Sequence, residues 1–170
     1  EKKVTAFRGT SDTEVLVEAV EAYGVAETIS HCKGMFAIAL FDRQTGKLTL
    51  IRDRIGEKPL YYGFVNGHFA FASDIGCLRV LDGFDNPIDT KVLQLYFIHG
   101  YIPAPYSIYK DIYKLDAGCM LELDAPYKEP GISTYWYVRE AARYGQAHPF
   151  QGSRQEAADE LERLLKASIR

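Results

Sequence analysis

Four short apolar segments separated by turn-forming residues lie between residues 34 and 73, and they constrain the fold more than any other feature. The segments span residues 34–42, 47–51, 60–65 and 69–73. Asn66-Gly67 separates the last two, and this dipeptide is the strongest short-range signal for a two-residue β-hairpin. The first segment is apolar throughout, so we expect a strand that is buried on both faces. Four successive strands after one helix predict an α+β layer fold with an antiparallel component.

The helix before these strands begins at Ser11-Asp12-Thr13-Glu14, which has the pattern of a capping box. In such a box the serine hydroxyl accepts a hydrogen bond from the backbone N–H of Glu14, and the Glu14 carboxylate reaches back. Apolar residues follow at helical spacing as far as Tyr23, and Gly24 is a natural C-terminal stop. We therefore predict a helix that ends at Gly24.

The second half of the chain contains shorter and more widely separated elements. A short helix is predicted near residues 78–81, a longer helix over 90–98 and two short strands within 112–123. Prolines and glycines punctuate a polar stretch at 126–152, which we interpret as a linker or an insertion. A second capping box at Ser153-Arg154-Gln155-Glu156 begins a last helix, whose apolar stripe continues to the end of the chain.

The composition is that of an ordinary globular protein and argues against two classes of function. Of the 170 residues, 47% are hydrophobic and 25% are charged, and the formal net charge is −3. This charge gives no electrostatic reason to expect nucleic acid or an anionic membrane surface as a partner. No apolar run approaches the roughly 18 residues that a membrane-spanning helix needs. Residue 1 is not methionine and no signal peptide follows, so we expect a piece of a longer protein.

The cysteines and histidines do not form a pattern that binds metal. Cys32, Cys77 and Cys119 are widely spaced, odd in number and without a C-x-x-C pair. This usage argues for a reducing, cytoplasmic environment and against a disulfide framework. Only His31 lies next to a cysteine, and adjacent residues rarely chelate one metal ion, so we expect no metal site.

The segment between the second and third predicted strands, residues 52–62, has the sequence RDRIGEKPLYY. Gly56 gives the backbone freedom to turn, and Pro59 fixes the return to extended structure. Its long or charged side chains are held at the end of a strand, where they can pair with one another or with another layer. They are Arg52, Asp53, Arg54 and Lys58. On chemistry alone, the segment is a solvated polar turn.

The same segment resembles the RD-x-x-G-x-x-PLYY motif of class II glutamine amidotransferases, and most closely that of asparagine synthetase. Residues 34–42, GMFAIALFD, resemble the GMFAFALWD strand of that family. Residues 69–75, FAFASDI, are similar to its FAFASEI segment, with Asp74 for glutamate and Gly76 where a lysine is usual. These departures change surface charge only.

Residues 100–115, GYIPAPYSIYKDIYKL, carry a further resemblance. They are similar to the GYIPAP-x-TIF-x-x-I-x-KL-x-PG segment of asparagine synthetases, which other class II amidotransferases lack. Ala117 stands where the family has proline, but Gly118 is kept, so we expect the turn to survive. Tyr135-Trp136 resembles the family's YW pair on the approach to the synthetase domain.

Asp12 is the candidate binding residue. Residues 9–14, GTSDTE, resemble the (G)-x-SD-x-E segment of the family, in which the matching aspartate binds the α-ammonium of glutamine. A carboxylate fixed at a helix end suits an ammonium, because the charge-assisted hydrogen bond then needs little reorganisation. The alternative is that Asp12 only satisfies backbone donors and the helix dipole, an effect of about 0.3–1 kcal/mol.

The resemblance implies an N-terminal-nucleophile hydrolase-type fold, an α/β/β/α sandwich that would be incomplete in this chain. Residues 1–125 would form the second half of the glutaminase domain, 126–152 a linker or insertion, and 153–170 the first helix of the synthetase domain. The implied partners are glutamine, the synthetase domain and a second copy in a homodimer.

The implied parent activity is that of a glutamine-hydrolysing asparagine synthetase, which converts aspartate, glutamine and ATP to asparagine, glutamate, AMP and pyrophosphate. The family's nucleophile is an N-terminal cysteine with its free α-amine as the base. That cysteine, the arginine loop for the glutamine carboxylate and the Asn-Gly oxyanion donors would lie upstream of Glu1. The loop for ATP would lie downstream of Arg170, and the Mg site would also lie outside this chain. We therefore assign no catalytic, cofactor or metal residue here and expect this chain alone to be inactive.

Two alternatives remain open. A relative with the same architecture would make another amide, as a β-lactam synthetase or a peptide cyclase does. A non-catalytic module would keep the scaffold only to bind a partner. An upstream N-terminal cysteine, arginine loop and Asn-Gly pair would favour the glutaminase over both.

Overall fold

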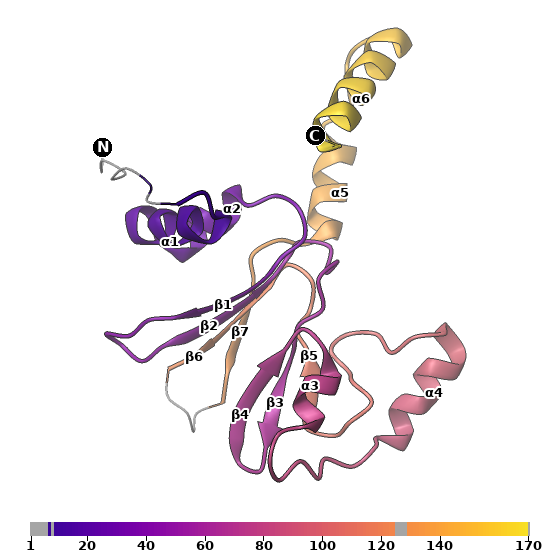
Figure 1. Cartoon of the computed structure of the whole chain (residues 1–170). Helices are drawn as coiled ribbons and strands as arrows, with labels where there is room; N and C mark the ends of the chain where they lie inside the picture. Colours follow the sequence, from indigo (N-terminus) through magenta and orange to yellow (C-terminus); the bar gives the residue numbers. More distant parts are fainter. Residues whose placement is uncertain (1–6, 8, 125–128, 170) are drawn as a thin grey trace. The chain divides into compact units, whose positions relative to one another are not determined.

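The computed structural model describes residues 7, 9–124 and 129–169, which fall into two units. The first unit reaches Tyr137 and contains both β-sheets, and the second unit begins at Val138 and contains two helices (Figure 1). All strand pairs in the described part are antiparallel, which confirms the predicted α+β class with an antiparallel component. None of the described helices is both long and apolar enough to cross a membrane.

The larger sheet has four strands in the order β1-β2-β6-β7. Its members are β1 (Ala37–Phe41), β2 (Leu48–Arg52), β6 (Cys119–Leu123) and β7 (Gly131–Thr134). Strand β2 lies between two neighbours, and its residues Thr49 to Arg52 are all buried. This strand therefore carries the core of the sheet.

The prediction that the first apolar segment is a strand buried on both faces is wrong. Strand β1 pairs only with β2 among the described strands, and its residues are half-buried or exposed. Phe41 is 61% exposed, and Met35 just before the strand is 70% exposed. A strand at the end of a sheet has one neighbour instead of two, so an apolar sequence there does not ensure burial.

The smaller sheet has three strands in the order β4-β3-β5. These are β3 (Tyr61–Val65), β4 (His68–Ala72) and β5 (Ile112–Lys114). Val65 pairs with His68 across Asn66-Gly67, whose φ angles are 49° and 76°. Two consecutive positive φ angles are typical of a type I′ turn, so the predicted hairpin is confirmed.

The two strands predicted within residues 112–123 are present, but they belong to different sheets. Strand β5 pairs with β3, while β6 pairs with β2. The turn at residues 116–118 therefore carries the chain from one sheet to the other. Buried side chains from both sheets form one core, which consists of Leu50, Leu60, Tyr62, Leu115, Cys119, Leu121 and Leu123. The four-layer sandwich itself stays a prediction.

Four helices belong to the described part of the first unit, and three of them were predicted. They are α1 (Asp12–Tyr23), α2 (Val25–His31), α3 (Ile75–Arg79) and α4 (Thr90–His99). Gly24 and Gly100 end α1 and α4 with φ angles of 83° and 74°, which favour glycine. Helix α2 follows α1 directly and was not predicted.

The second unit consists of α5 (Val138–Ala147) and α6 (Arg154–Ser168). The capping box of α6 is confirmed, because Glu156 N–H donates to Ser153 Oγ and Ser153 N–H donates to the Glu156 carboxylate at 2.7 Å. Strand β7 and helix α5 lie inside the stretch interpreted as a linker or insertion, whose residues 126–128 are outside the described residues. The domain boundaries stay a prediction.

Candidate functional site

Asp12 is the first residue of α1, where the helix dipole favours a negative charge. Ser11 caps the helix, and its hydroxyl accepts a 3.2 Å hydrogen bond from the N–H of Thr13. The Asp12 carboxylate is exposed, and its Oδ1 accepts a long, 3.4 Å hydrogen bond from the Thr13 hydroxyl. No ion pair joins Asp12 to a cation of the described residues. Most of its hydrogen-bonding capacity is thus available.

The predicted capping box at this helix start is wrong in both of its hydrogen bonds. Ser11 accepts from Thr13 instead of Glu14, and the Glu14 carboxylate accepts from the N–H of Gly9 at 2.8 Å. The carboxylate therefore reaches two residues further back than a capping box requires. It fixes the chain that enters the helix, and this contact helps to hold the turn that carries Asp12.

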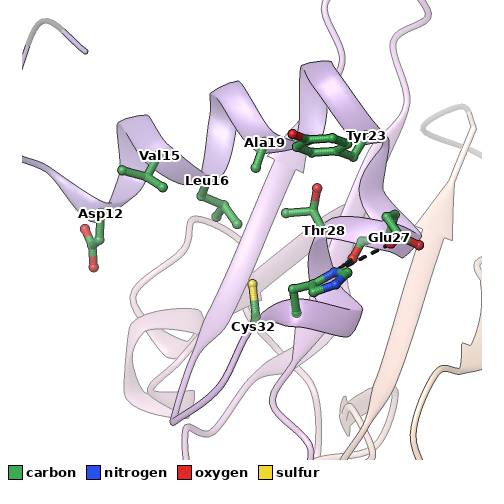
Figure 2. Close-up of a pocket in the computed structure, with 9 residues that line it drawn as sticks. Asp12, Val15, Leu16, Ala19, Tyr23, Glu27, Thr28 and Cys32 are labelled. Atoms are coloured by element: carbon green, nitrogen blue, oxygen red, sulfur yellow. Dashed lines mark hydrogen bonds and ion pairs between the residues drawn. The ribbon is translucent and has the colours of Figure 1, made fainter. Parts of the chain in front are cut away.

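A hollow of about 580 Å³ lies between α1 and α2, with Asp12 in its lining. Figure 2 shows the α1 side chains along one wall, with Thr28 and Cys32 facing them. Thr28 is only 6% exposed, and its hydroxyl has no hydrogen-bond partner among the described residues. The hollow is mainly apolar apart from these groups and the Glu27–His31 pair.

A second hollow, of about 490 Å³, shares Asp12, Leu16 and Cys32 with the first. The chain that leads into β1 forms part of it, and so does Lys58 from the segment after β2. Its charged groups are Asp12, Lys33 and Lys58, and the rest of the lining is largely apolar. Both volumes fall in the range of small-molecule sites.

The segment after β2 is a rigid support and not a solvated turn. Asp53 is fully buried, and its carboxylate accepts hydrogen bonds from the N–H groups of Ile55, Glu57, Lys58 and Phe36 at 3.2, 3.0, 2.9 and 3.4 Å. Burial alone would raise the pKa of Asp53, but the surrounding backbone N–H groups outweigh it and hold the pKa below its usual value. The carboxylate therefore organises the backbone of this turn in its ionised form.

Arg52 complements Asp53 by binding carbonyl groups. Its guanidinium donates to the carbonyls of Lys58 at 2.9 Å, Leu115 at 2.6 Å and Gly56 at 2.5 Å. Arg54 also donates to a carbonyl, that of Ser30, at 2.7 Å. Of the two expected arrangements, pairing with another part of the fold is observed, since Arg52 and Arg54 bind the backbone of Leu115 and Ser30, whereas no ion pair in the described part joins these charges to one another.

The turn at residues 116–118 and the YW pair are attached to the same support. Gly118 N–H donates to the Asp53 carbonyl at 2.9 Å, and the Gly118 carbonyl accepts from the N–H groups of Tyr135 and Trp136. The Tyr135 hydroxyl donates to the Arg52 carbonyl at 2.8 Å. Burial, with a smaller contribution from Asp53, raises the pKa of Tyr135 to about 12, so this donor keeps its proton. The turn survives despite Ala117, as predicted.

No cysteine of the described part has the surroundings of an activated nucleophile. Cys119 is buried in β6 and Cys77 is exposed in α3. Cys32 ends α2 and lines both hollows, but burial raises the pKa of its thiol and the nearby Arg54 offsets this only in part. The described residues also contain no cluster of side chains that would hold a metal ion.

Comparison with known proteins identifies the class. The model of the glutamine amidotransferase domain family matches residues 1–136, and the chain belongs to this family. The chain is similar to the putative asparagine synthetase (glutamine-hydrolyzing) 2 of Methanocaldococcus jannaschii, with 36% identity over 128 residues, which are 74% of this chain and 25% of that protein. The resemblance inferred from the motifs is confirmed.

Two bacterial relatives extend the similarity over more of the chain. The putative asparagine synthetase (glutamine-hydrolyzing) of Mycobacterium tuberculosis is 32% identical over 167 residues, which are 96% of this chain and 25% of that protein. The asparagine synthetase (glutamine-hydrolyzing) 2 of Bacillus subtilis is 31% identical, with 96% of this chain and 23% of that protein covered. The chain therefore spans about a quarter of the length of these relatives.

Sequence reasoning singled out Asp12, whose binding role stays a prediction, but it did not place any other group beside this residue. Thr28 lies in helix α2 and Cys32 ends it, and this helix was not predicted. Lys58 was assigned only to a polar turn. The available signal for Lys58 was the pattern of Gly56 and Pro59, which indicates a fixed loop beside a strand end. Nothing in the sequence alone relates that loop to the start of α1.

Proposed function

We propose that the chain is the second half of a glutaminase domain, in which Asp12 binds the α-ammonium of glutamine. The observation that supports this most is the placement of Asp12 at the first turn of α1, exposed, without an ion pair in the described part, and in the lining of both hollows. An ammonium has three donors, and a carboxylate with free lone pairs can accept from them with charge-assisted strength.

The proposed binding mode assigns distinct tasks to the residues around Asp12. The Ser11 cap and the Glu14–Gly9 hydrogen bond fix the turn that carries the carboxylate, so little freedom is lost when the ammonium binds. The positive end of the helix dipole favours a negative charge at this position. The apolar residues of the two hollows would exclude water around the aliphatic part of the substrate.

The parent protein we infer is a glutamine-dependent asparagine synthetase of the cytoplasm, active as a homodimer. Its upstream cysteine would release ammonia from glutamine, and a synthetase domain that follows this chain would use the ammonia with aspartate and ATP. ATP and Mg would bind to that domain, outside this chain. The names of the relatives, which describe glutamine-hydrolysing asparagine synthetases, support this proposal.

The test is an assay of glutamate release by the full-length protein, with Asp12→Asn beside wild type. Loss of a charge-assisted hydrogen bond of about 2 kcal/mol is expected to raise KM for glutamine roughly 30-fold. Amide synthesis from free ammonia should be unchanged, because it does not need the glutamine site. Asp82→Asn removes an exposed carboxylate that lines neither hollow and is the matched control.

Two results would contradict the proposal. If Asp12→Asn leaves KM for glutamine at the wild-type value, Asp12 does not bind the ammonium. If wild type releases no glutamate at all, the scaffold serves another amide synthesis or only binds a partner.

A further inference from the structure

Helix α1, which carries Asp12, is loosely packed against the described part of the first unit. None of its residues is buried, and Val15 and Val17 are 50% and 49% exposed although both are apolar. The neighbouring helix α2, which is shorter, buries Thr28 and Ile29. A helix whose apolar residues stay half-exposed makes few stabilising contacts, and such elements are the parts of a fold that move most easily.

Two hollows lie between α1 and β1. The second hollow lies at the start of the helix, and a third hollow of about 250 Å³ continues from it, since Thr13, Leu16, Ala37 and Ile38 line both. The third hollow is mainly apolar, and its lining includes Leu16, Val17 and Val20 of the helix and Ile38, Leu40 and Ile51 of the sheet. Folded interiors are normally close-packed, and side chains that face an empty space lose contacts. The packing of α1 on the sheet is therefore incomplete in this state.

The joint between α1 and α2 has the features of a hinge. Gly24 joins the two helices directly, and its φ and ψ angles are 83° and 166°. A Cβ atom built on Gly24 would meet nothing within 4 Å, so no packed neighbour fixes this residue. Glycine has access to a wide range of backbone angles, and hinges typically consist of a few residues at the end of an element. A rotation at Gly24 would move α1 relative to the sheet.

We propose that α1 closes towards β1 as a lid when the α-ammonium of an amino acid binds Asp12. This inference rests on the proposed glutamine site and adds a conformational step to it. A ligand in the second hollow lies between Asp12 and the residues that lead into β1, Met35 and Phe36. It gains contacts on both sides when the helix moves, and only such a difference in affinity shifts a conformational equilibrium. Closure also removes the third hollow and brings the apolar side chains of α1 onto the sheet.

The first experiment measures hydrogen exchange in the full-length protein with and without L-glutamate, the product of glutamine hydrolysis, which keeps the α-ammonium. Closure is expected to slow the exchange of peptides that cover residues 17–24 by about fivefold or more. These residues do not line the second hollow, so contact with the ligand alone would slow exchange only at residues 12–16. The hairpin of residues 61–72 belongs to the other sheet and should exchange at the same rate in both samples.

The second experiment measures glutamate binding to Val20→Ala by calorimetry. Val20 is half-buried and lines the third hollow but neither of the other two, so it does not contact a ligand beside Asp12. Since closure buries the rest of its side chain, loss of two methyl groups is expected to weaken binding about fourfold. Val25→Ala is the matched control, because this half-buried valine of α2 lines none of the three hollows and should bind glutamate as wild type does.

The outcomes separate this inference from the proposed function. If glutamate slows exchange only at residues 12–16, or if Val20→Ala and Val25→Ala bind it equally well, α1 does not close and the inference is wrong. The site at Asp12 would still stand in those cases if Asp12→Asn loses glutamate binding. If Asp12→Asn binds glutamate as wild type does, or if wild type binds neither glutamate nor glutamine, the site itself is wrong and the lid is overturned with it.

Discussion

Asp53 and Asp12 have the same side chain, but the surroundings of their carboxylates are opposite. Asp53 is fully buried and accepts hydrogen bonds from four backbone N–H groups. Asp12 is exposed, and its side chain accepts one long hydrogen bond from a neighbouring hydroxyl. The buried carboxylate has little capacity left for a ligand, whereas the exposed one keeps most of its lone pairs free.

The comparison shows how structure separates a scaffold residue from a proposed binding residue when residue type does not. In the sequence both aspartates belong to family motifs, and both lie at the end of a secondary-structure element. What differs is whether the folded chain already satisfies the charge. A satisfied buried charge stabilises the fold around it, while an unsatisfied charge at a hollow stabilises a complex.

The largest expected effect comes from Asp53→Asn, which tests this distinction directly. The new amide places an N–H₂ donor among backbone N–H donors and leaves buried groups without acceptors. We expect the free energy of unfolding of the full-length protein to fall by about 3 kcal/mol. Asp12→Asn should lower it by less than about 1 kcal/mol, because only the dipole interaction weakens. Urea denaturation monitored by near-UV circular dichroism measures both values.

Glutamine affinity provides a second comparison of the same two variants. Below its unfolding transition, Asp53→Asn should lose part of its glutamine affinity, because Asp53 holds the backbone of Lys58 and Phe36 in the lining of the second hollow. Asp12→Asn should lose affinity while its free energy of unfolding falls by less than about 1 kcal/mol. Equal losses of stability for the two variants would show that the division into scaffold and binding carboxylates is wrong.

The next largest effect tests whether the structure held by Asp53 includes the turn at residues 116–118, which carries the chain from one sheet to the other. Gly118 has a φ of 65°, and a Cβ atom there would lie 2.2 Å from the carbonyl oxygen of Trp136. Gly118→Ala is therefore expected to lower the free energy of unfolding by about 2 kcal/mol or more, since both the backbone and the contact oppose it. Thermal unfolding of the full-length protein measures the loss.

Gly34→Ala is the matched control for that variant. Gly34 also has a positive φ, 95°, but nothing lies within 4 Å of a Cβ atom built on it. Gly34→Ala should therefore lower the free energy of unfolding by about 1 kcal/mol, the value of the backbone strain alone. If the two variants are equally stable, the close approach of Trp136 does not restrict residue 118.

Local signals in the sequence predicted most of the elements of this fold. The hairpin at Asn66-Gly67 and the ends of α1 and α4 at glycines depend on the backbone preferences of single residues, which the sequence states directly. Helix α2 was missed because seven residues give two turns at most, too few for a periodic pattern to emerge. Strand β7 was missed for a related reason, since all four of its residues are exposed and it is held by backbone pairing with β6.

The candidate site could be predicted only in part. Asp12 stands out because a helix start is a local feature and its motif resembles that of a known family. The prediction that β1 is buried on both faces was wrong because an apolar strand can be central or at an edge. Only the pairing of distant strands decides which of these it is. Lys58 could not be related to Asp12 because 46 residues separate them, by the difference of their numbers, and the hollow that they share forms only on folding.

The smallest expected effect concerns Tyr135, whose hydroxyl ties the end of β7 to the carbonyl of Arg52 at 2.8 Å. Tyr135→Phe should lower the free energy of unfolding by about 1 kcal/mol at neutral pH, the net value of one such hydrogen bond. Burial raises the pKa of this phenol to about 12, above the value near 10 expected in the unfolded chain. Folding therefore favours the protonated form, and its contribution is complete below pH 10 and is lost as the pH rises towards 12. The difference between wild type and variant should shrink over that interval, while Tyr137→Phe, at a side chain that is 44% exposed, should show no such trend. A difference that stays constant from pH 9 to 12 would mean that the Tyr135 hydroxyl does not support the scaffold in the way its geometry indicates.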